Sequence, residues 1–221
     1  MAGAVLAKKL TIVAALTGGV LAACIFFGVG WIGLALITAF FFIGTLTTSW
    51  KKKVKQTLGL AQGNKGRRTT GQVLANGGAG GLLGLFAIVF PAHASLFLLL
   101  MAAAFSSATA DTISSELGSV YGRRFYDVLN FRRTQPGPDG VVSCEGLLFG
   151  VLGSVVIAVI YSVGQGWSQN FAWIVVAGTA GNLADSYLGA TLERKQLLSN
   201  DAVNFLNTAI AALIAYLLYA V

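Results

Sequence analysis

The chain has 221 residues, of which 56% are hydrophobic and only 10% are charged, and its mean hydropathy is +0.75. Soluble globular chains contain about 25% charged residues, so this composition excludes a water-soluble enzyme. The net charge is +7, but the way the basic residues cluster between apolar segments argues against nucleic-acid binding. The two cysteines, Cys24 and Cys144, provide neither a disulfide framework nor a metal cluster. The composition is that of an integral membrane protein.

Apolar segments long enough to cross a membrane follow one another along the chain. A spanning helix needs about 20 mostly apolar residues, and no Lys, Arg, Asp or Glu occurs between Leu10 and Trp50. That stretch is long enough for two spans, and Gly28, Gly30 and Gly33 mark the reversal between them. We therefore predict an all-α fold, a single polytopic membrane bundle over residues 1–221 with about seven transmembrane helices, at about 10–28, 32–50, 71–90, 94–110, 146–163, 170–189 and 203–220.

The basic residues set the expected orientation. All 15 lysines and arginines lie before the first span or in the loops 51–70, 111–145 and 190–202, which seven spans place on one side. Basic loops stay cytoplasmic, so we expect a cytoplasmic N-terminus and an extracytoplasmic C-terminus. The lysines between 51 and 55 are interpreted as topology and headgroup anchors. The first apolar region resembles neither a cleaved signal nor a transit peptide, which favours the cytoplasmic membrane of a prokaryote.

Two carboxylates lie in or beside expected spans. Asp111 follows a run of small and apolar residues, and Asp185 lies inside another. A carboxylate at the edge of the hydrocarbon costs several kcal/mol unless it is paired, hydrated or metal-bound, so both are functional candidates. The simpler alternative is that each carboxylate reaches interfacial water from a helix end.

The neighbours of these two acids favour a divalent cation. Asp111 and Glu116 would lie about 140° apart on an ideal helix, so they share a ligand only if the helix ends or bends there. Asn182, Asp185 and Ser186 form one polar stripe at helical spacing. Oxygen ligands of this kind suit Mg²⁺, and the absence of His or Cys near them in the sequence disfavours zinc.

The loop before the segment 146–163 combines glycines, prolines and a hydroxyl in the sequence PGPDGVVS, residues 136–143. Ser143 is placed to cap the incoming helix, and free N–H groups at a helix N-terminus bind phosphate. Arg132 and Arg133 precede this loop, and guanidinium groups pair with phosphate bidentately. An ordinary turn with a helix cap is the alternative. A second basic loop contributes further candidates, namely Lys65, Arg67 and Arg68, followed by Asn76.

Four motifs carry a resemblance to a known family. In chain order they are VLANGG at 73–78, SATADT with ELG at 107–118, GNLADSYLGA at 181–190 and NDAVNFL at 200–206. In these motifs the chain resembles the integral-membrane prenyl-phosphate kinase family, which includes phytyl-phosphate kinase of the tocopherol pathway. It is more distantly similar to CTP-dependent polyprenol kinases and to phosphatidate cytidylyltransferase. In the loop that these relatives share, Pro138 replaces a threonine and Val141 replaces a smaller residue, whereas Gly137, Asp139, Gly140 and Ser143 match.

The resemblance implies Mg²⁺-dependent transfer of a phosphoryl group from a nucleoside triphosphate, with CTP expected, to a prenyl monophosphate. It implies Asp111, Glu116 and Asp185 as catalytic residues and magnesium ligands. The nucleotide and its phosphates would contact a larger set: Asn182, Asp139, Gly140, Ser143, Arg132, Arg133, Lys65, Arg67, Arg68 and Asn76. Membrane lipids are further expected partners, and a homo-oligomer is left open.

Three alternatives remain at this stage. A CTP-dependent cytidylyltransferase or a lipid alcohol kinase would need a similar site for magnesium and a triphosphate. An ion-coupled transporter is the alternative that is not an enzyme, since intramembrane acids can couple Na⁺ or H⁺ to transport. Transporter sites lie near the bilayer midplane, whereas the acids of this chain cluster towards one face, which favours the enzymes.

Overall fold

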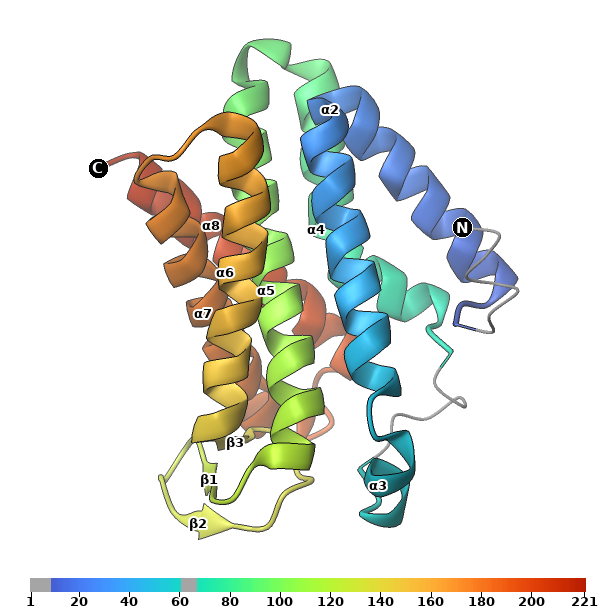
Figure 1. Ribbon diagram of the computed structural model, residues 1–221, viewed down its shortest axis with the longest axis vertical. Helices are drawn as coiled ribbons and strands as arrows, with labels where there is room; N and C mark the ends of the chain where they lie inside the picture. The colour runs from blue at the N-terminus through green and yellow to red at the C-terminus, as the bar shows by residue number, and fades with distance from the viewer. Residues whose placement is uncertain (1–8, 61–66) are drawn as a thin grey trace.

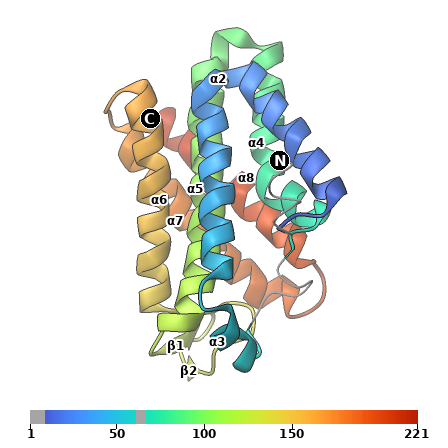
Figure 2. The ribbon, with the colours of Figure 1, turned by 45° about the vertical axis from the view of Figure 1, so that its right-hand side comes forward.

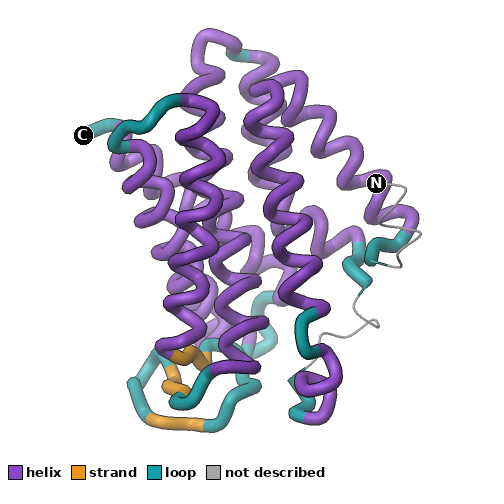
Figure 3. Tube along the Cα trace, in the orientation of Figure 1, coloured by secondary structure: helices purple, strands orange, loops and turns teal. Residues whose placement is uncertain are grey.

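The computed structural model describes residues 9–60 and 67–221, most of which are helical (Figures 1 and 3). The helices are α2 (Ile12–Ser49), α3 (Lys52–Thr57), α4 (Thr70–Val89), η2 (Pro91–His93), α5 (Ala94–Tyr121), α6 (Cys144–Gln165), α7 (Asn170–Leu188), the π-helical η3 (Gly189–Glu193) and α8 (Asn200–Tyr219). The strands β1 (Phe125–Asp127), β2 (Arg133–Thr134) and β3 (Val141–Ser143) form a small antiparallel sheet between α5 and α6, in the order β2-β1-β3.

Helix α2 consists of two arms that diverge from a sharp turn (Figure 1). At the turn, Gly30 has φ 74° and ψ −155°, a conformation open to glycine because it lacks a Cβ atom. The reversal predicted at the glycine cluster is thereby confirmed. Five helices in the described residues, α2, α4, α5, α6 and α8, have the length and hydropathy of membrane spans. With α2 counted as two arms and with α7, the bundle contains the seven helical segments that the sequence predicts.

Helix α5 is the centre of the bundle. Residues 98–110 are all buried, and α5 contacts α2, α4, α6, α7 and α8 (Figure 2). Small residues allow this packing. A Cβ atom at Gly178 of α7 would lie 2.0 Å from the hydroxyl oxygen of Ser106, and one at Gly181 would lie 2.2 Å from that of Ser107. Close approach of backbones through small residues is the usual way in which membrane helices associate.

Helix α5 also continues to Tyr121, beyond the end predicted for it at residue 110. The sequence prediction ended the span at Asp111 because a charge terminates an apolar run. In the structure Thr112, Ile113 and Glu116 remain buried, so the helix continues through protein rather than into a loop. Asp111 therefore belongs to the middle of a helix.

The end of the bundle that holds α3, the sheet and η3 is called the polar end below (Figure 1). Helices that begin there have side-chain caps: Thr69 and Gln72 form a capping box on α4, and Ser143, as predicted, accepts the N–H of Gly146 at 3.0 Å on α6. Lys9 donates a hydrogen bond to the hydroxyl of Ser49 at this end. The other described basic residues lie in α3 or in the connections at the polar end. The predicted clustering of basic residues on one side of the bundle is thus present.

The contact between α2 and α4 depends on the close approach of Gly28 and Gly84. A Cβ atom at Gly28 would lie 2.2 Å from the carbonyl oxygen of Gly84, whereas a Cβ atom at Gly19 would meet nothing within 4 Å. Gly28→Ala should lower the free energy of unfolding by about 1–3 kcal/mol, because the backbones must separate. Gly19→Ala, the matched control in the same arm, should be neutral or stabilising by about 0.5–1 kcal/mol. Thermal unfolding in detergent would measure both, and equal midpoints would contradict the close contact.

Candidate active site

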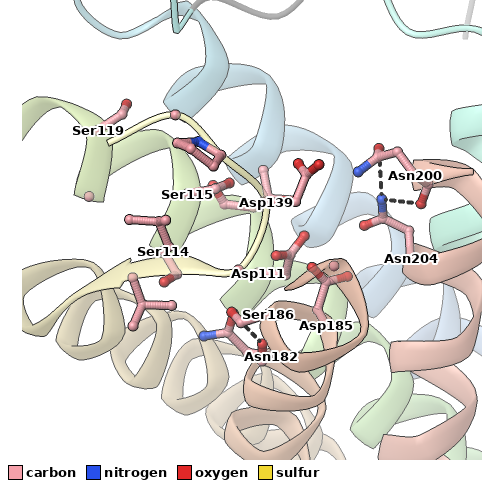
Figure 4. A pocket seen from close by; sticks show the side chains of 18 of the residues that line it. Asp111, Ser114, Ser115, Ser119, Asp139, Asn182, Asp185, Ser186, Asn200 and Asn204 are labelled. Carbon is pink, nitrogen blue, oxygen red and sulfur yellow. Dashed lines mark hydrogen bonds between the residues drawn. The ribbon is translucent and has the colours of Figure 1, made fainter. Parts of the chain in front are cut away.

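A polar cavity of about 300 Å³ lies at the polar end of the bundle. Helices α4, α5, α7 and α8 form its walls, and the loop 136–142 passes over it (Figure 4). Most of the lining side chains are carboxylates, amides and hydroxyls: Asp111, Asp139, Asp185, Glu193, Gln72, Asn76, Asn182, Asn200, Asn204, Ser114, Ser115, Ser119, Ser143 and Ser186. Such a concentration of polar groups in a largely apolar bundle marks a candidate functional site.

The carboxylates of Asp111 and Asp185 stand together in this cavity. They come from α5 and α7, and their carboxyl groups point towards one another in the cavity (Figure 4). Asn207 of α8 orients the pair, because its Nδ2 donates to Oδ2 of Asp185 at 2.6 Å. Two neighbouring carboxylates repel each other at low dielectric, and a divalent cation bound to both removes the repulsion. The sequence prediction that these two acids belong to one site agrees with this geometry.

Two further carboxylates, Asp139 and Glu193, face the same cavity from the loop and from η3. The pKa of Glu193 is raised to about 7, first by burial and then by the negative charges of Asp139 and Asp185, while a hydrogen bond with Asn200 opposes the shift. Near neutral pH the Glu193 carboxyl is therefore divided between its two protonation states. A cation in the cavity would favour the ionised form.

Two amide side chains at the cavity each have a buried polar atom without a hydrogen-bond partner within the described ranges. Asn182 is 2% exposed, and its Nδ2 has no hydrogen-bond partner among the described residues; the same holds for Oδ1 of Asn76. An unsatisfied buried polar group costs about 1–3 kcal/mol. Both residues line the cavity, but these two atoms are themselves buried, and Nδ2 of Asn182 lies on the side of α6, where a Cβ atom at Gly150 would be 2.8 Å from it.

The loop over the cavity is fixed by its contacts with the junction of α7 and η3. Gly140 has φ +73°, and a Cβ atom there would lie 2.6 Å from the carbonyl oxygen of Ser186. Arg194 donates from Nε to the carbonyl oxygen of Asp139 and from Nη1 to Oδ2 of Asp127, each at 2.5 Å. The same ion pair lowers the pKa of Asp127 below its ordinary value, chiefly through the hydrogen bond from Arg194. These contacts place Asp139 over the cavity.

Arg68 is the one cation among the described residues that line the cavity. Its guanidinium carbon lies 5.0 Å from the centre of the Phe40 ring and 5.9 Å from that of Phe41. Burial lowers the pKa of Arg68 to about 10, although the negative charge of Glu116 opposes this. The guanidinium therefore remains charged at neutral pH and is available to pair with an anion in the cavity.

The donor set fits a magnesium ion that is bound together with a phosphate ligand. Within residues 9–60 and 67–221, no group of three or more His, Cys, Asp or Glu side chains is arranged to hold a metal by itself. Mg²⁺ is usually bound by one or two carboxylates and takes its remaining ligands from water and substrate phosphates. Asp111 and Asp185 meet that requirement, and the unsatisfied amide of Asn182 lies beside them.

Most of the residues predicted from the sequence lie in this cavity, and some do not. The lining includes Asp111, Asp185, Asn182, Asp139, Gly140, Ser143, Arg68 and Asn76. Arg132 and Arg133 are exposed in the loop around β2, Arg67 is exposed before α4, and none of the three lines the cavity. Lys65 lies outside the described residues. The sheet explains where Arg132 and Arg133 lie. Asp139 and Gly140, just before β3, line the cavity, whereas β2 with Arg133 pairs on the other side of β1.

Glu116, predicted as a third metal ligand, does not line the cavity. Its Oε2 forms an ion pair with Nζ of Lys55, and the two side chains are 5% and 1% exposed. Lys55 also donates to the carbonyl oxygens of Thr47 and Thr48, each at 3.0 Å. Because α5 neither ends nor bends between Asp111 and Glu116, the two carboxylates point in different directions. Lys55 is accordingly a buried structural cation rather than the headgroup anchor that its loop position predicted.

Glu193, Asn200 and Asn204 also line the cavity, although the sequence did not predict them as site residues. The motif at 200–206 carries part of the family resemblance, which implies no role for its asparagines; in the structure Asn204 donates a hydrogen bond of 3.0 Å to Asn200. Glu193 follows the motif at 181–190 closely, and a helical continuation of that motif would have brought it to the same end of the bundle. The π-helical turn at 189–193 that places it there has no evident sequence signal.

The Lys55–Glu116 pair yields a second stability prediction. Lys55→Met or Glu116→Leu should each destabilise the protein by about 3–5 kcal/mol, because each leaves one charge buried without its partner. The double variant Lys55→Met/Glu116→Leu should recover much of this loss, since both charges are then removed together. Unfolding midpoints of the three variants in detergent would test this. A double variant as unstable as the sum of the single variants would show that the two side chains do not interact.

The fold and the cavity together define a class: polytopic α-helical membrane proteins with an acid-lined polar site at one end of the bundle. Residues 1–212 match the family described as integral membrane protein DUF92, and the chain belongs to that family. No solved structure matches the chain.

Three relatives have sequences of comparable similarity. Protein VTE6, chloroplastic, of Arabidopsis thaliana is 33% identical over 193 residues, which are 84% of this chain and 58% of that protein. An uncharacterized membrane protein of Synechocystis sp. is 33% identical over 202 residues, 89% of this chain and 77% of the relative. Another, of Methanocaldococcus jannaschii, is 34% identical over 190 residues, 84% of this chain and 76% of the relative. The family assignment agrees with the resemblance to membrane prenyl-phosphate kinases that the four motifs carry.

Proposed function

We propose that this protein transfers the γ-phosphoryl group of a nucleoside triphosphate, with CTP expected, to a prenyl monophosphate. An oxygen of the acceptor phosphate bonds to the γ-phosphorus while the bond between that phosphorus and its bridging oxygen to the β-phosphate breaks. The products are a prenyl diphosphate and a nucleoside diphosphate. The proposal is supported by the meeting of Asp111 and Asp185 in a polar cavity that also contains Arg68, and by the resemblance of the chain to prenyl-phosphate kinases.

The charge of the cavity explains why a metal ion belongs to the proposal. Four carboxylates and one guanidinium line it among the described residues, so a triphosphate would enter a negatively charged space. Bound Mg²⁺ would neutralise phosphate charge and polarise the γ-phosphoryl group. Asp111 and Asp185 would hold the ion, Asn182 would contact phosphate from the α7 wall of the cavity, and the loop 136–142 would exclude bulk water.

The proposed acceptor removes the need for a general base. A phosphate monoester is already largely dianionic near neutral pH, since its second pKa is about 6. Catalysis then consists mainly of positioning and charge neutralisation. His93, the one histidine of the chain, lies in η2 at the opposite end of the bundle, and this is consistent with such an acceptor.

Cytidylyl transfer is the nearest alternative, because it would use the same magnesium and triphosphate site. Products separate the two reactions: phosphoryl transfer releases CDP and a prenyl diphosphate, whereas cytidylyl transfer releases diphosphate and a CDP-lipid. The test is to incubate purified protein with radiolabelled CTP, Mg²⁺ and phytyl, farnesyl or geranylgeranyl monophosphate. Formation of labelled prenyl diphosphate from γ-labelled CTP supports the proposal, and a CDP-lipid from α-labelled CTP would replace it.

The location of the cavity bears on the transporter alternative. Its walls include the first turns of α4 and α8 and the last turns of α7, beside the loop 136–142 and η3. A charged nucleotide can reach such a position from the aqueous phase without crossing the hydrocarbon. We propose that this end faces the cytoplasm of a prokaryotic cell, in keeping with the basic residues gathered there.

Asp111→Asn and Asp185→Asn should each lower the phosphoryl transfer rate by about a hundredfold or more, because the carboxylate charge that holds the cation is lost while the side-chain shape is kept. Glu145→Gln is the matched control: this carboxylate accepts the N–H of Arg123 at the same end of the bundle, outside the cavity. Rates are compared at equal amounts of folded protein, verified by size-exclusion chromatography. Full activity in both aspartate variants would remove them from the site.

Magnesium affinity should depend on pH through Glu193. The pKa of this group is raised to about 7, so a cation that enters at lower pH must displace a proton. The apparent affinity for Mg²⁺ should rise about tenfold between about pH 6 and about pH 8, and Glu193→Gln should remove most of that rise. Displacement of Mn²⁺ followed by electron paramagnetic resonance gives the affinity without turnover. An unchanged pH profile in Glu193→Gln would show that Glu193 does not face the cation.

A further inference from the structure

A second cavity, of about 290 Å³, lies between the two arms of α2 and the adjacent face of α4. It is called the wedge here and is lined mainly by apolar residues, among them Leu10, Ala14, Gly18, Leu34, Phe41 and Val73. Its volume is close to the lower end of the range of ordinary ligand pockets, about 300–1,000 Å³. The wedge exists because the turn at Gly30 makes the arms of α2 diverge (Figure 1).

Arg68 belongs to both the wedge and the polar cavity. It stands between an apolar space and an acid-lined one, and no carboxylate in the described part of the chain forms an ion pair with it. Its guanidinium stacks on the Phe40 ring. It also packs closely against Gly44, where an added Cβ atom would lie only 2.2 Å from Nη2 of Arg68. An amphiphile with a hydrocarbon chain in the wedge would therefore present its head group to Arg68.

A third cavity provides an internal comparison. It has a volume of about 550 Å³, lies between the first arm of α2, α4 and α8, and is also lined mainly by apolar residues. Its polar lining residue is Asp201, whose Oδ2 lies 2.1 Å from the position of a Cβ atom at Gly71. A carboxylate there repels an anionic head group, whereas Arg68 attracts one. Charge complementarity thus selects the wedge for a lipid that carries a phosphate.

We propose that the wedge binds the hydrocarbon chain of the acceptor next to its phosphate, and that Arg68 holds this phosphate at the boundary with the polar cavity. This deepens the proposed function and rests on it. The wedge is small, about 290 Å³, so the ligand that we assign to it is a phosphate monoester on a single hydrocarbon chain. A prenyl monophosphate has this form, and a two-chain phosphatidate does not.

Photo-cross-linking tests the proposal without turnover. The probe is geranylgeranyl monophosphate with a diazirine in its second isoprene unit, added to the full chain in detergent and followed by peptide mass spectrometry. Labels should concentrate on the wedge residues of α2 and α4. Unlabelled geranylgeranyl monophosphate should compete, whereas geranylgeraniol, inorganic phosphate and a dioleoyl phosphatidate at equal concentration should compete at least about tenfold less well, because each lacks one part of the ligand.

Two matched variants locate the chain. Thr38→Trp fills the mouth of the wedge at an exposed position, and Leu82→Trp fills the third cavity at another exposed position. Labelling should fall about tenfold or more in Thr38→Trp and stay unchanged in Leu82→Trp. Arg68→Gln should weaken labelling by about tenfold to a hundredfold, the usual effect of losing hydrogen bonds between charged groups.

The outcomes separate this inference from the proposed function. Labels on the third cavity, labels spread evenly over lipid-facing helices, or equal effects of the two tryptophan variants would overturn the wedge, even if phosphoryl transfer is measured. Specific labelling of the wedge with no transfer from any nucleoside triphosphate would support lipid binding there and overturn the kinase activity. If Arg68→Gln does not fold, Thr38→Trp against Leu82→Trp still decides the matter.

Discussion

The meeting of two carboxylates inside the packed end of a membrane bundle is the constraint on which the site depends. Asp111 and Asp185 come together because α5 and α7 approach closely where Gly178 and Gly181 face serine hydroxyls. The amide of Asn207 then fixes one member of the pair. Removing these acids from bulk water would be costly without a compensating cation or proton, so the packing of three helices creates a position suited to a cation.

The charges around this pair have separate roles. The basic residues of the polar end suggest phosphate binding when the sequence is considered alone, yet several of them act elsewhere in the structure. Lys55 neutralises Glu116 inside the protein, and Arg194 attaches the loop to η3 through Asp127 and Asp139. Arg68 remains as the cation that faces the cavity among the described residues. Carboxylates therefore outnumber cations in the described lining of the cavity, and this is why the proposed function pairs an anionic co-substrate with a metal ion.

The sequence determines the helical segments well, because their signals are local. The absence of Lys, Arg, Asp and Glu from Leu10 to Trp50, the turn at Gly30 and the cap at Ser143 can each be recognised within a few positions. Asp111 and Asp185 could be selected because a charge in an apolar run is costly wherever the helix packs. The partner of Glu116 could not be predicted, since it is 61 residues away and depends on how α3 folds against α5.

In the proposed function, the polar cavity and the wedge serve two different media. A nucleotide is too polar to enter the hydrocarbon, and the cavity proposed for it lies where α5 and α7 end and α8 begins, beside the sheet and η3. A hydrocarbon chain gains by staying among apolar side chains, and the diverging arms of α2 leave such a space. Arg68 lies at the boundary between the two spaces. In a phosphate carried on a hydrocarbon chain, the chain matches the apolar wedge and the phosphate matches the polar cavity.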